Sequence, residues 1–279
     1  MQVYKGLDIG SAKISNSEME NIPHHLIDIL NFNEDFNVFL FKKYAKEALD
    51  IIYRNGNVPI ICGGTGFYIQ ALLYDIEFCN EDNSIIRAEL EEKADKMGNE
   101  YLFNELKEID PESALVIHPN NTKRIIRALE FYYLNGKKFS DHNEEEKQKE
   151  SPYNFCYFVL NDDREVLYNR IDKRVDKMLE LGLVDEVKNL YEHGLCTGMT
   201  SAEGIGYKQL LPYLEGNISL EDALNNIKTD SRHYAKRQLT WFRREKDTIW
   251  LNRDEYNQNS DLLLEKIIKV LKEKEIINE

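Results

Sequence analysis

The turn at residues 63–66, of sequence GGTG, has the residue types and spacing of an anion-binding site. An apolar stretch precedes it, and a segment of helical character, 67–74, follows it. We therefore expect backbone N–H groups to gather at the start of a helix, where the helix dipole favours negative charge. A plain connection between a strand and a helix explains the same residues, since a glycine turn alone is weak evidence.

A stripe of cationic side chains is the second candidate. Arg170, Arg174 and Lys177 recur at helical spacing in a helix that we expect from Arg164 to about His193. Salt bridges on a solvated face would account for such a stripe. The helix directly follows an apolar strand, however, and helices in that position often border a ligand crevice at the carboxyl edge of a parallel sheet.

The most basic part of the chain is residues 228–244, KTDSRHYAKRQLTWFRR. Its cationic side chains are interleaved with aromatic ones, namely Arg232, Tyr234, Lys236, Arg237, Trp241, Arg243 and Arg244. Phosphates attract the cations and bases stack on the rings, so this mixture suits a nucleic acid. The aromatic residues by themselves would more often belong to the core.

The composition limits the classes of function. Charged residues make up 31% and hydrophobic residues 42% of the 279 residues, as in a soluble globular protein, and no apolar run approaches a membrane span. The formal net charge of −14 opposes nucleic-acid binding on average, so a polyanion has to be met by local basic patches. The cysteines are scattered and predict reduced thiols without a metal site: Cys62, Cys79, Cys156 and Cys196.

Around these residues the apolar periodicity alternates between strands and helices. We expect strands at 24–29 and 58–61 and helices at 36–53 and 67–74, with Asp35 capping the first helix. This order predicts a parallel sheet covered by helices. The run 155–160 and Trp250-Leu251 are expected to be further strands, and Ser219 to begin a helix between them.

Residues 81–154 are charged and free of strand patterns. Helices are expected at 85–97, 101–109 and 121–135, the last capped by Asn121 and ended by Gly136. The polar stretch 139–153 is expected to be an exposed loop. The chain is thus divided into an α/β core, residues 1–80 and 155–279, and an all-helical insertion, residues 81–154.

Several segments, in order, resemble the bacterial tRNA dimethylallyltransferases, also called tRNA isopentenyltransferases. They are MQVYKGLDIGSAK, HHLIDI, CGGTGFYIQALLY, HPNNTKRIIRALE, LYNRIDKRVDKMLELGLVDEV, GIGYKQ and YAKRQLTWFRR. Together they cover nearly the whole chain. So many matches in one order are far more specific than any single glycine turn.

The resemblance implies transfer of a dimethylallyl group from dimethylallyl diphosphate to the exocyclic amine of the adenosine just 3′ of the anticodon in tRNA. It implies a P-loop NTPase-like parallel sheet flanked by helices, a helical insertion that grips the anticodon stem-loop, and Mg²⁺ that assists the leaving diphosphate. The target base is flipped into a channel, and contacts to the splayed loop have to offset that cost. We expect a monomeric enzyme of the cytoplasm.

Site residues are implied position by position. Thr65 matches the threonine that helps to position the reacting amine, and Arg174 matches the arginine expected to hold the diphosphate. Met1 and Gln2 match the end of the segment DSMQ, which recognises the target nucleotide. Further tRNA contacts are implied for Arg87, Lys123, Arg124, Ile125, Ile126, Arg127, Gly206, Tyr207, Lys208, Gln209, Lys236, Arg237 and Gln238.

The chain departs from the family pattern at its start. In the family, a strand, a P-loop and a helix precede DSMQ, whose aspartate is the general base, whereas this sequence begins at the methionine of that segment. No G-x-x-x-x-G-K-[ST] run occurs, so we expect the first strand and the P-loop to be absent. Either the start codon was placed at an internal methionine, or the chain is a truncated relative.

Other functions compete with tRNA prenylation. A binding-only relative would show salt-dependent tRNA affinity without turnover. An enzyme that prenylates free adenine nucleotides is the closer rival, although the long insertion and the basic segment 228–244 favour tRNA. A kinase of small molecules or nucleotides is disfavoured because it would also need a P-loop.

Overall fold

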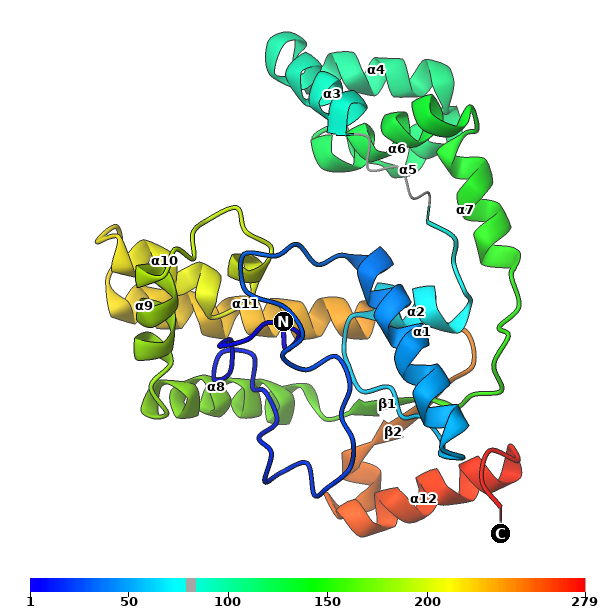
Figure 1. Ribbon diagram of the computed structural model, residues 1–279, viewed down its shortest axis with the longest axis vertical. Helices are drawn as coiled ribbons and strands as arrows, with labels where there is room; N and C mark the ends of the chain where they lie inside the picture. The colour runs from blue at the N-terminus through cyan, green and yellow to red at the C-terminus, as the bar shows by residue number, and fades with distance from the viewer. Residues whose placement is uncertain (79–83, 279) are drawn as a thin grey trace. The chain divides into compact units, whose positions relative to one another are not determined.

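The computed structural model describes residues 1–78 and 84–278, and the chain forms two compact units (Figure 1). The first unit combines Met1–Leu72 with Tyr153–Glu279, and the second is Leu73–Pro152. The second unit therefore begins before the predicted start of the insertion at residue 81. Of the predicted features, Cys79 lies outside the described residues.

A small parallel sheet lies in the first unit. Strand β1 (Tyr157–Asn161) pairs with β2 (Thr248–Asn252), and the register places Val159 beside Trp250 (Figure 1). Both strands were predicted, and their parallel pairing is confirmed. Parallel strands need a long crossover between them, and the helical residues between 164 and 242 supply it.

The helices of the first unit follow the predicted apolar periodicity. They are α1 (Val38–Arg54), α2 (Gly66–Leu73), α8 (Arg164–Glu180), α9 (Leu183–Glu192), α10 (Tyr207–Leu214), α11 (Leu220–Phe242) and α12 (Ser260–Glu273), with short 3-10 helices at Ser201–Glu203 and Arg253–Tyr256. As predicted, the Ser219 side chain caps α11 by accepting a hydrogen bond from Asp222 N.

Two predictions about the helices of this unit were wrong. Asn37 caps α1 in place of Asp35, and the helix expected to reach His193 breaks at Gly182, whose φ is 98°.

Two predicted strands do not form. Residues 58–61 have no ladder partner in the described part of the chain, and Ile60 is 84% exposed. Within 24–29, Leu26 and Asp28 have φ values of 62° and 53°, which belong to the left-handed region and not to a strand. Near this segment the backbone forms an isolated bridge between Tyr4 and Leu30. The apolar pattern at these segments could not reveal that strand neighbours are lacking.

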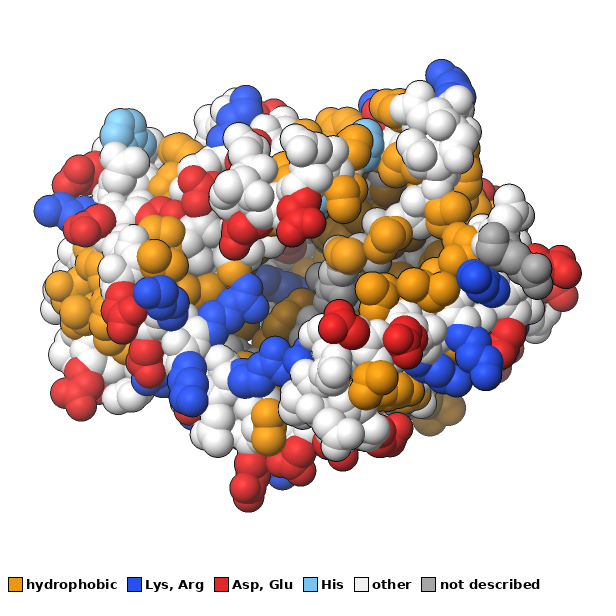
Figure 2. All heavy atoms as spheres, turned by 90° about the horizontal axis from the view of Figure 1, so that it is seen from below, with side chains coloured by type: hydrophobic (Ala, Val, Ile, Leu, Met, Phe, Trp, Pro, Cys, Tyr) orange, Lys and Arg blue, Asp and Glu red, His pale blue; other side chains and the backbone are white. Residues whose placement is uncertain are grey.

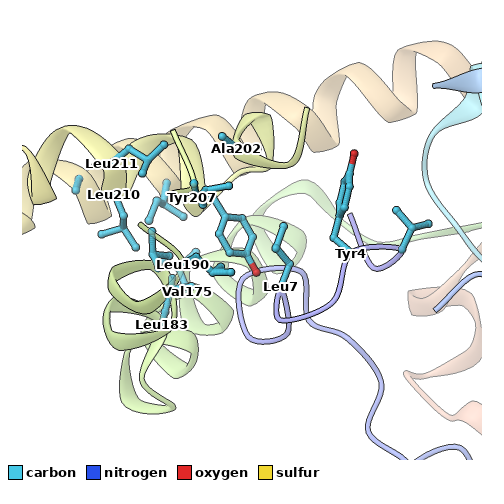
Figure 3. Packing of buried hydrophobic residues seen from close by; sticks show 14 of the residues in the cluster. Tyr4, Leu7, Val175, Leu183, Leu190, Ala202, Tyr207, Leu210 and Leu211 are labelled. Atoms are coloured by element: carbon cyan, nitrogen blue, oxygen red, sulfur yellow. The ribbon is translucent and has the colours of Figure 1, made fainter. Parts of the chain in front are cut away.

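The core of the first unit gathers residues that are distant in the sequence (Figure 3). Tyr4 and Leu7 of the N-terminal segment belong to the same buried cluster as Leu183 of α9 and Tyr207 and Leu210 of α10, and Figure 3 shows Leu7 beside Tyr207. Leu7 and Tyr207 are each 0% exposed. Burial of one such side chain stabilises a fold by about 1.5–3 kcal/mol. The N-terminal segment is therefore anchored although it forms no helix.

The second unit is built from helices. They are α3 (Ser84–Met97), α4 (Asn99–Ile109), α5 (Pro111–Val116), α6 (Thr122–Asn135) and α7 (Phe139–Gln148). As predicted, the Asn121 side chain caps α6 and Gly136, with φ of 64°, ends it. The loop predicted from 139 to 153 was wrong in its first part. Helix α7 forms there, and at its start Ser140 N and Oγ donate hydrogen bonds to the buried Asp110 carboxylate.

The surface mixes charges of both signs. On the face drawn in Figure 2, acidic and basic side chains alternate with hydrophobic ones, so the net charge of −14 does not make that face uniformly negative. None of the described helices is long and apolar enough to cross a membrane.

Candidate functional site

The glycine turn packs against α11. Nε2 of Gln238 donates a hydrogen bond to Gly64 O at 2.8 Å. The hydroxyl oxygens of Thr65 and Tyr234 lie 3.4 Å apart. The turn before α2 and helix α11, which are far apart in the sequence, are thereby brought together, and Thr65 lies beside the basic segment.

Gly66 lies where the turn approaches the Trp241 ring of α11. A Cβ atom at this position would come within 2.1 Å of the Trp241 ring, so the close approach requires glycine. The Phe67 ring meets the Trp241 ring edge-on, with 6.3 Å between the centroids. Tyr234, Gln238 and Trp241 recur at i, i+4 and i+7, so one stripe of α11 positions the whole turn.

A cationic surface adjoins this stripe. An open hollow of about 390 Å³ is lined by His233, Lys236, Arg237, Thr240, Trp241 and Arg244. The Arg237 guanidinium lies 5.7 Å from the centre of the Tyr234 ring, within the range of a cation–π contact. Lys236 and Arg237 are exposed. The predicted residues of α11 therefore present cations and rings next to the glycine turn.

Within the cationic stripe of α8, Arg174 has no carboxylate partner among the described residues. Arg170 donates to the buried Asp162 at 2.6 Å, and Lys177 pairs with Glu180 at 3.1 Å. The Arg174 side chain is exposed. Salt bridges thus account for two members of the stripe and leave Arg174 available to an anion.

Arg174 and Thr65 are not brought together by any contact in the described part of the chain. On α8, Asp172 and Asp176 form ion pairs with α11. Arg174 lies midway between them in the sequence, so the helical period places it on the other side of α8. These contacts therefore do not form a pocket shared by Arg174 and Thr65.

Met1 and Gln2 belong to a loop with hydrogen bonds between its own residues. Nε2 of Gln2 donates to the carbonyl oxygens of Ser11 and Ala12 at 3.2 and 3.0 Å. Lys13, with its side chain only 5% exposed, donates to Tyr4 O and Asp8 Oδ1 of the same loop and to Asp28 Oδ1 further along the chain. Burial and the charge of Lys13 lower the pKa of the Met1 amine. The predicted nucleotide-recognition segment is therefore held in one conformation.

Glu186 of α9 fixes this loop, and nothing in the sequence pattern singled it out. Its carboxylate accepts hydrogen bonds from the backbone N–H groups of Asp8, Ile9 and Gly10 at 3.1, 2.7 and 3.1 Å. The Tyr207 hydroxyl donates to the same carboxylate at 2.7 Å (Figure 3 shows Tyr207 beside Leu7). Burial and the Glu186 charge both raise the pKa of Tyr207. One side chain thus joins the N-terminal loop, α9 and α10.

Most of the predicted tRNA-binding segment 206–209 is turned inward. Tyr207 is 0% exposed, and Gly206 is buried. Gln209 accepts a hydrogen bond from Gly206 N at 2.9 Å and donates one to a carboxylate of α11 at 2.7 Å. Lys208 is exposed and forms an ion pair with a neighbouring glutamate. The side chains of Tyr207 and Gln209 are occupied within the fold and do not face an RNA.

In the second unit, the predicted cations lie at the start of α6. Lys123 and Arg124 are exposed, whereas Ile125 and Ile126 are 0% and 5% exposed in the core of the unit. The two isoleucine side chains are therefore not available to an RNA, because they form the apolar face of the helix. The remaining predicted pair, Arg87 of α3 and Arg127 of α6, converges on Glu130.

Metal ligands are not clustered. Among the described residues, no group of three or more His, Cys, Asp or Glu side chains is placed to hold a metal ion. The described cysteines Cys62, Cys156 and Cys196 are free thiols, as predicted. The described part of the chain thus offers no dedicated cage for a divalent cation.

Comparisons with known proteins agree with one another. The family model described as IPP transferase matches residues 2–245. Over 278 residues the chain is 54% identical to a tRNA dimethylallyltransferase of Lachnoclostridium phytofermentans, which covers 99% of this chain and 88% of that protein. The crystal structure of a tRNA delta(2)-isopentenylpyrophosphate transferase from Staphylococcus epidermidis is similar, with 42% identity, a TM-score of 0.69 and coverage of 98% of this chain and 88% of that one. A eukaryotic dimethylallyltransferase acting on tRNA is similar at 30% identity and a TM-score of 0.76, over 90% of this chain and 65% of that one.

Proposed function

The chain belongs to the IPP transferase family, and on that premise we propose that it transfers a dimethylallyl group from dimethylallyl diphosphate to tRNA. The acceptor is the exocyclic amine of the adenosine just 3′ of the anticodon. The amine nitrogen forms a bond to the prenyl carbon while the carbon–oxygen bond to the diphosphate breaks. The amine also releases one proton to solvent, so the products are the prenylated amine, free diphosphate and a proton.

The observation that carries this proposal is the packing of the glycine turn on α11. Thr65, whose hydroxyl can orient the amine, lies 3.4 Å from the Tyr234 hydroxyl of α11, the helix that also carries the exposed Lys236 and Arg237. Cations and aromatic rings are the groups that contact the backbone and the splayed bases of an RNA loop. The turn and the helix together therefore support a site where a flipped base meets Thr65.

Arg174 is proposed to hold the diphosphate. Its guanidinium is exposed and has no carboxylate partner among the described residues, in contrast to Arg170. Negative charge grows on the diphosphate as it leaves, and a preorganised cation lowers such a barrier by about 3–4 kcal/mol, by analogy with single oxyanion-hole donors. No described contact joins Arg174 to Thr65, so this role of Arg174 is proposed from the family resemblance and from its unpaired guanidinium.

Mg²⁺ is proposed to bind together with the diphosphate. The described residues form no cluster of three or more metal-ligating side chains, and Mg²⁺ commonly binds through one or two carboxylates plus substrate phosphates. When bound, the ion would neutralise charge on the leaving group. From the family resemblance alone we also propose a P-loop NTPase-like core, a cytoplasmic location and a monomeric enzyme.

The test is prenyl transfer by the full chain. Labelled dimethylallyl diphosphate and Mg²⁺ are supplied with an unmodified tRNA transcript that carries adenosine 3′ of the anticodon. A matched transcript with guanosine at that position is the control, and adenosine monophosphate is offered as a free acceptor. We expect label only in the adenosine transcript, released on digestion as N6-dimethylallyl adenosine.

Two other outcomes would overturn the proposal. Label on adenosine monophosphate without label on tRNA would assign the chain to the enzymes that prenylate free nucleotides. Salt-dependent tRNA binding without any transfer would show that the chain binds tRNA but does not prenylate it.

A further inference from the structure

Glu130 of α6 is a buried carboxylate with two arginine partners. Its side chain is 1% exposed, and its Oε2 lies 3.0 Å from Arg127 Nη1 and 3.8 Å from Arg87 Nη2. Arg127 lies one turn away on α6, and Arg87 comes from α3. A single carboxylate therefore connects guanidinium groups from two helices of the second unit.

This carboxylate has no evident advantage for the core. Glu130 belongs to the buried part of α6, together with Ala128, Leu129 and Phe131. Burying an ion pair costs desolvation energy, and hydrophobic residues of similar volume often serve stability equally well or better. Stability alone therefore does not account for a buried carboxylate at Glu130.

The two arginines keep part of their surface in solvent. The side chain of Arg87 is 44% exposed and that of Arg127 is 40% exposed. A guanidinium has five N–H donors in a rigid fork, so a carboxylate on one side leaves others free for a second anion. Glu130 thus contacts one part of each guanidinium, and other N–H donors of both groups remain accessible to solvent.

The start of α6 carries charges that oppose helix stability. Lys123 and Arg124 lie in its first turn, where the helix dipole is already positive, and that turn has no acidic residue. Arg127 follows one turn later. This concentration of positive charge costs stability but attracts anions.

From these observations we infer that Glu130 is a positioning residue for RNA backbone contacts made by Arg87 and Arg127. The inference rests on the proposed tRNA substrate. The buried carboxylate fixes the two guanidinium groups before the RNA arrives, which lowers the entropy lost when they engage phosphates. Lys123 and Arg124 extend the same phosphate-binding surface.

The test compares Glu130→Gln with Glu145→Gln in the full chain. Both variants remove one negative charge from the second unit, but Glu145 pairs with Lys137 and touches neither arginine. Affinity for an unmodified tRNA transcript is measured over a range of salt concentrations, with circular dichroism as a check on folding. We expect Glu130→Gln to weaken binding about fivefold to twentyfold and to reduce the salt slope by roughly one to two, at about 0.7–0.9 per phosphate contact.

A double variant separates positioning from a general effect on the fold. In the Arg87→Gln/Arg127→Gln background, Glu130→Gln should change affinity by less than twofold, because the groups through which it acts are gone. Should Glu130→Gln fail to fold, Glu130→Asp keeps the charge with a shorter reach and should still lower the salt slope. In transfer assays, KM for tRNA should rise while kcat stays within twofold.

Several results would overturn the inference. They are unchanged or tighter tRNA binding by folded Glu130→Gln, an equal loss with Glu145→Gln, or a full effect in the double-arginine background. Failure of the proposed function gives a different pattern, since the wild-type chain would then form no prenylated tRNA whatever Glu130 does.

Discussion

At the scale of single residues, the glycine turn is the part of the site with the least freedom. A Cβ atom at Gly64 would come within 1.8 Å of Gln238 Nε2, the mobile end of a flexible side chain. At Gly66 the obstacle is the Trp241 ring, whose movement would disturb its packing with Phe67. A methyl group is therefore tolerated less well at Gly66 than at Gly64.

We predict that Gly66→Ala displaces the turn from α11. Overpacking of this kind costs about 1–3 kcal/mol, and a shift of Thr65 should lower kcat/KM for prenyl transfer at least about tenfold. Tryptophan emission reports the accompanying change around Trp241. Gly63→Ala is the matched control, because nothing lies within 4 Å of a Cβ atom there. Equal losses in the two variants would contradict this explanation.

The Tyr207 hydroxyl is a second residue with a defined energetic role. We predict that Tyr207→Phe lowers the free energy of unfolding by about 1–2 kcal/mol, because Glu186 loses one of its donors. Tyr213→Phe on the same helix should change it by less than about 0.5 kcal/mol, since its hydroxyl has no hydrogen bond among the described residues. Urea unfolding measures both. Similar values for the two variants would show that the Tyr207–Glu186 bond contributes nothing to stability.

At the scale of elements, polar side chains at helix ends join one helix to the next. Asp110 caps α5 by accepting hydrogen bonds from Ser113 N and Oγ at 3.0 and 2.6 Å. It also accepts bonds from Ser140 N and Oγ at 2.9 and 2.6 Å, at the start of α7. Burial by itself would raise the pKa of Asp110, but the bonds from Ser113 and Ser140 outweigh it and lower the pKa.

The lowered pKa gives a pH-dependent prediction for Asp110→Asn. The folded pKa lies below the unfolded value of about 3.9, so the stabilisation is complete above that value and is lost as the pH falls through the folded pKa. At pH near 7 the variant should be less stable by about 1–3 kcal/mol, and the difference should shrink below about pH 4. Urea unfolding at several pH values tests this, with Asp95→Asn on exposed α3 surface as control. A difference that is constant with pH would be inconsistent with an ionised cap.

At the scale of the whole molecule, charge decides how a polyanion can bind. The chain carries a formal net charge of −14, so attraction for RNA has to arise from local groups such as the cations of α11 and of α6. Long-range repulsion and short-range attraction respond differently to salt. Binding should therefore weaken as salt rises, with a slope set by the number of phosphates contacted.

We predict that Lys236→Gln/Arg237→Gln weakens tRNA binding and makes the salt slope shallower by roughly 1.4–1.8, for two lost phosphate contacts. Lys266→Gln/Lys272→Gln on α12 changes the net charge equally and should leave the slope unaltered, because those exposed residues lie outside the proposed site. Affinity measured at several salt concentrations distinguishes the two. Parallel slopes for both double variants would mean that only net charge matters.

The sequence by itself determined the local features of this protein and its family. Helix caps such as Asn121 and Ser219 could be predicted from the sequence, because the residues that mark a cap lie within a few positions of the helix that it begins. Strands β1 and β2 could be predicted because each corresponds to a short apolar run with polar residues at its ends. The ordered motifs identified the family, since each one is a contiguous stretch of chain.

Only the tertiary structure decided which of the singled-out residues are exposed and which are buried in the fold. Glu186 and Ile9 are 177 positions apart, so no local pattern could reveal that one carboxylate holds the N-terminal loop. Tyr207 and Gln209 follow glycines in a plausible binding segment, yet both are buried. The stretch at 58–61 is apolar enough for a strand but has no ladder partner in the described part of the chain. The physical reason is the same each time: hydrogen-bond partners and burial are set by contacts across the fold, whereas caps and periodicity act within a few residues.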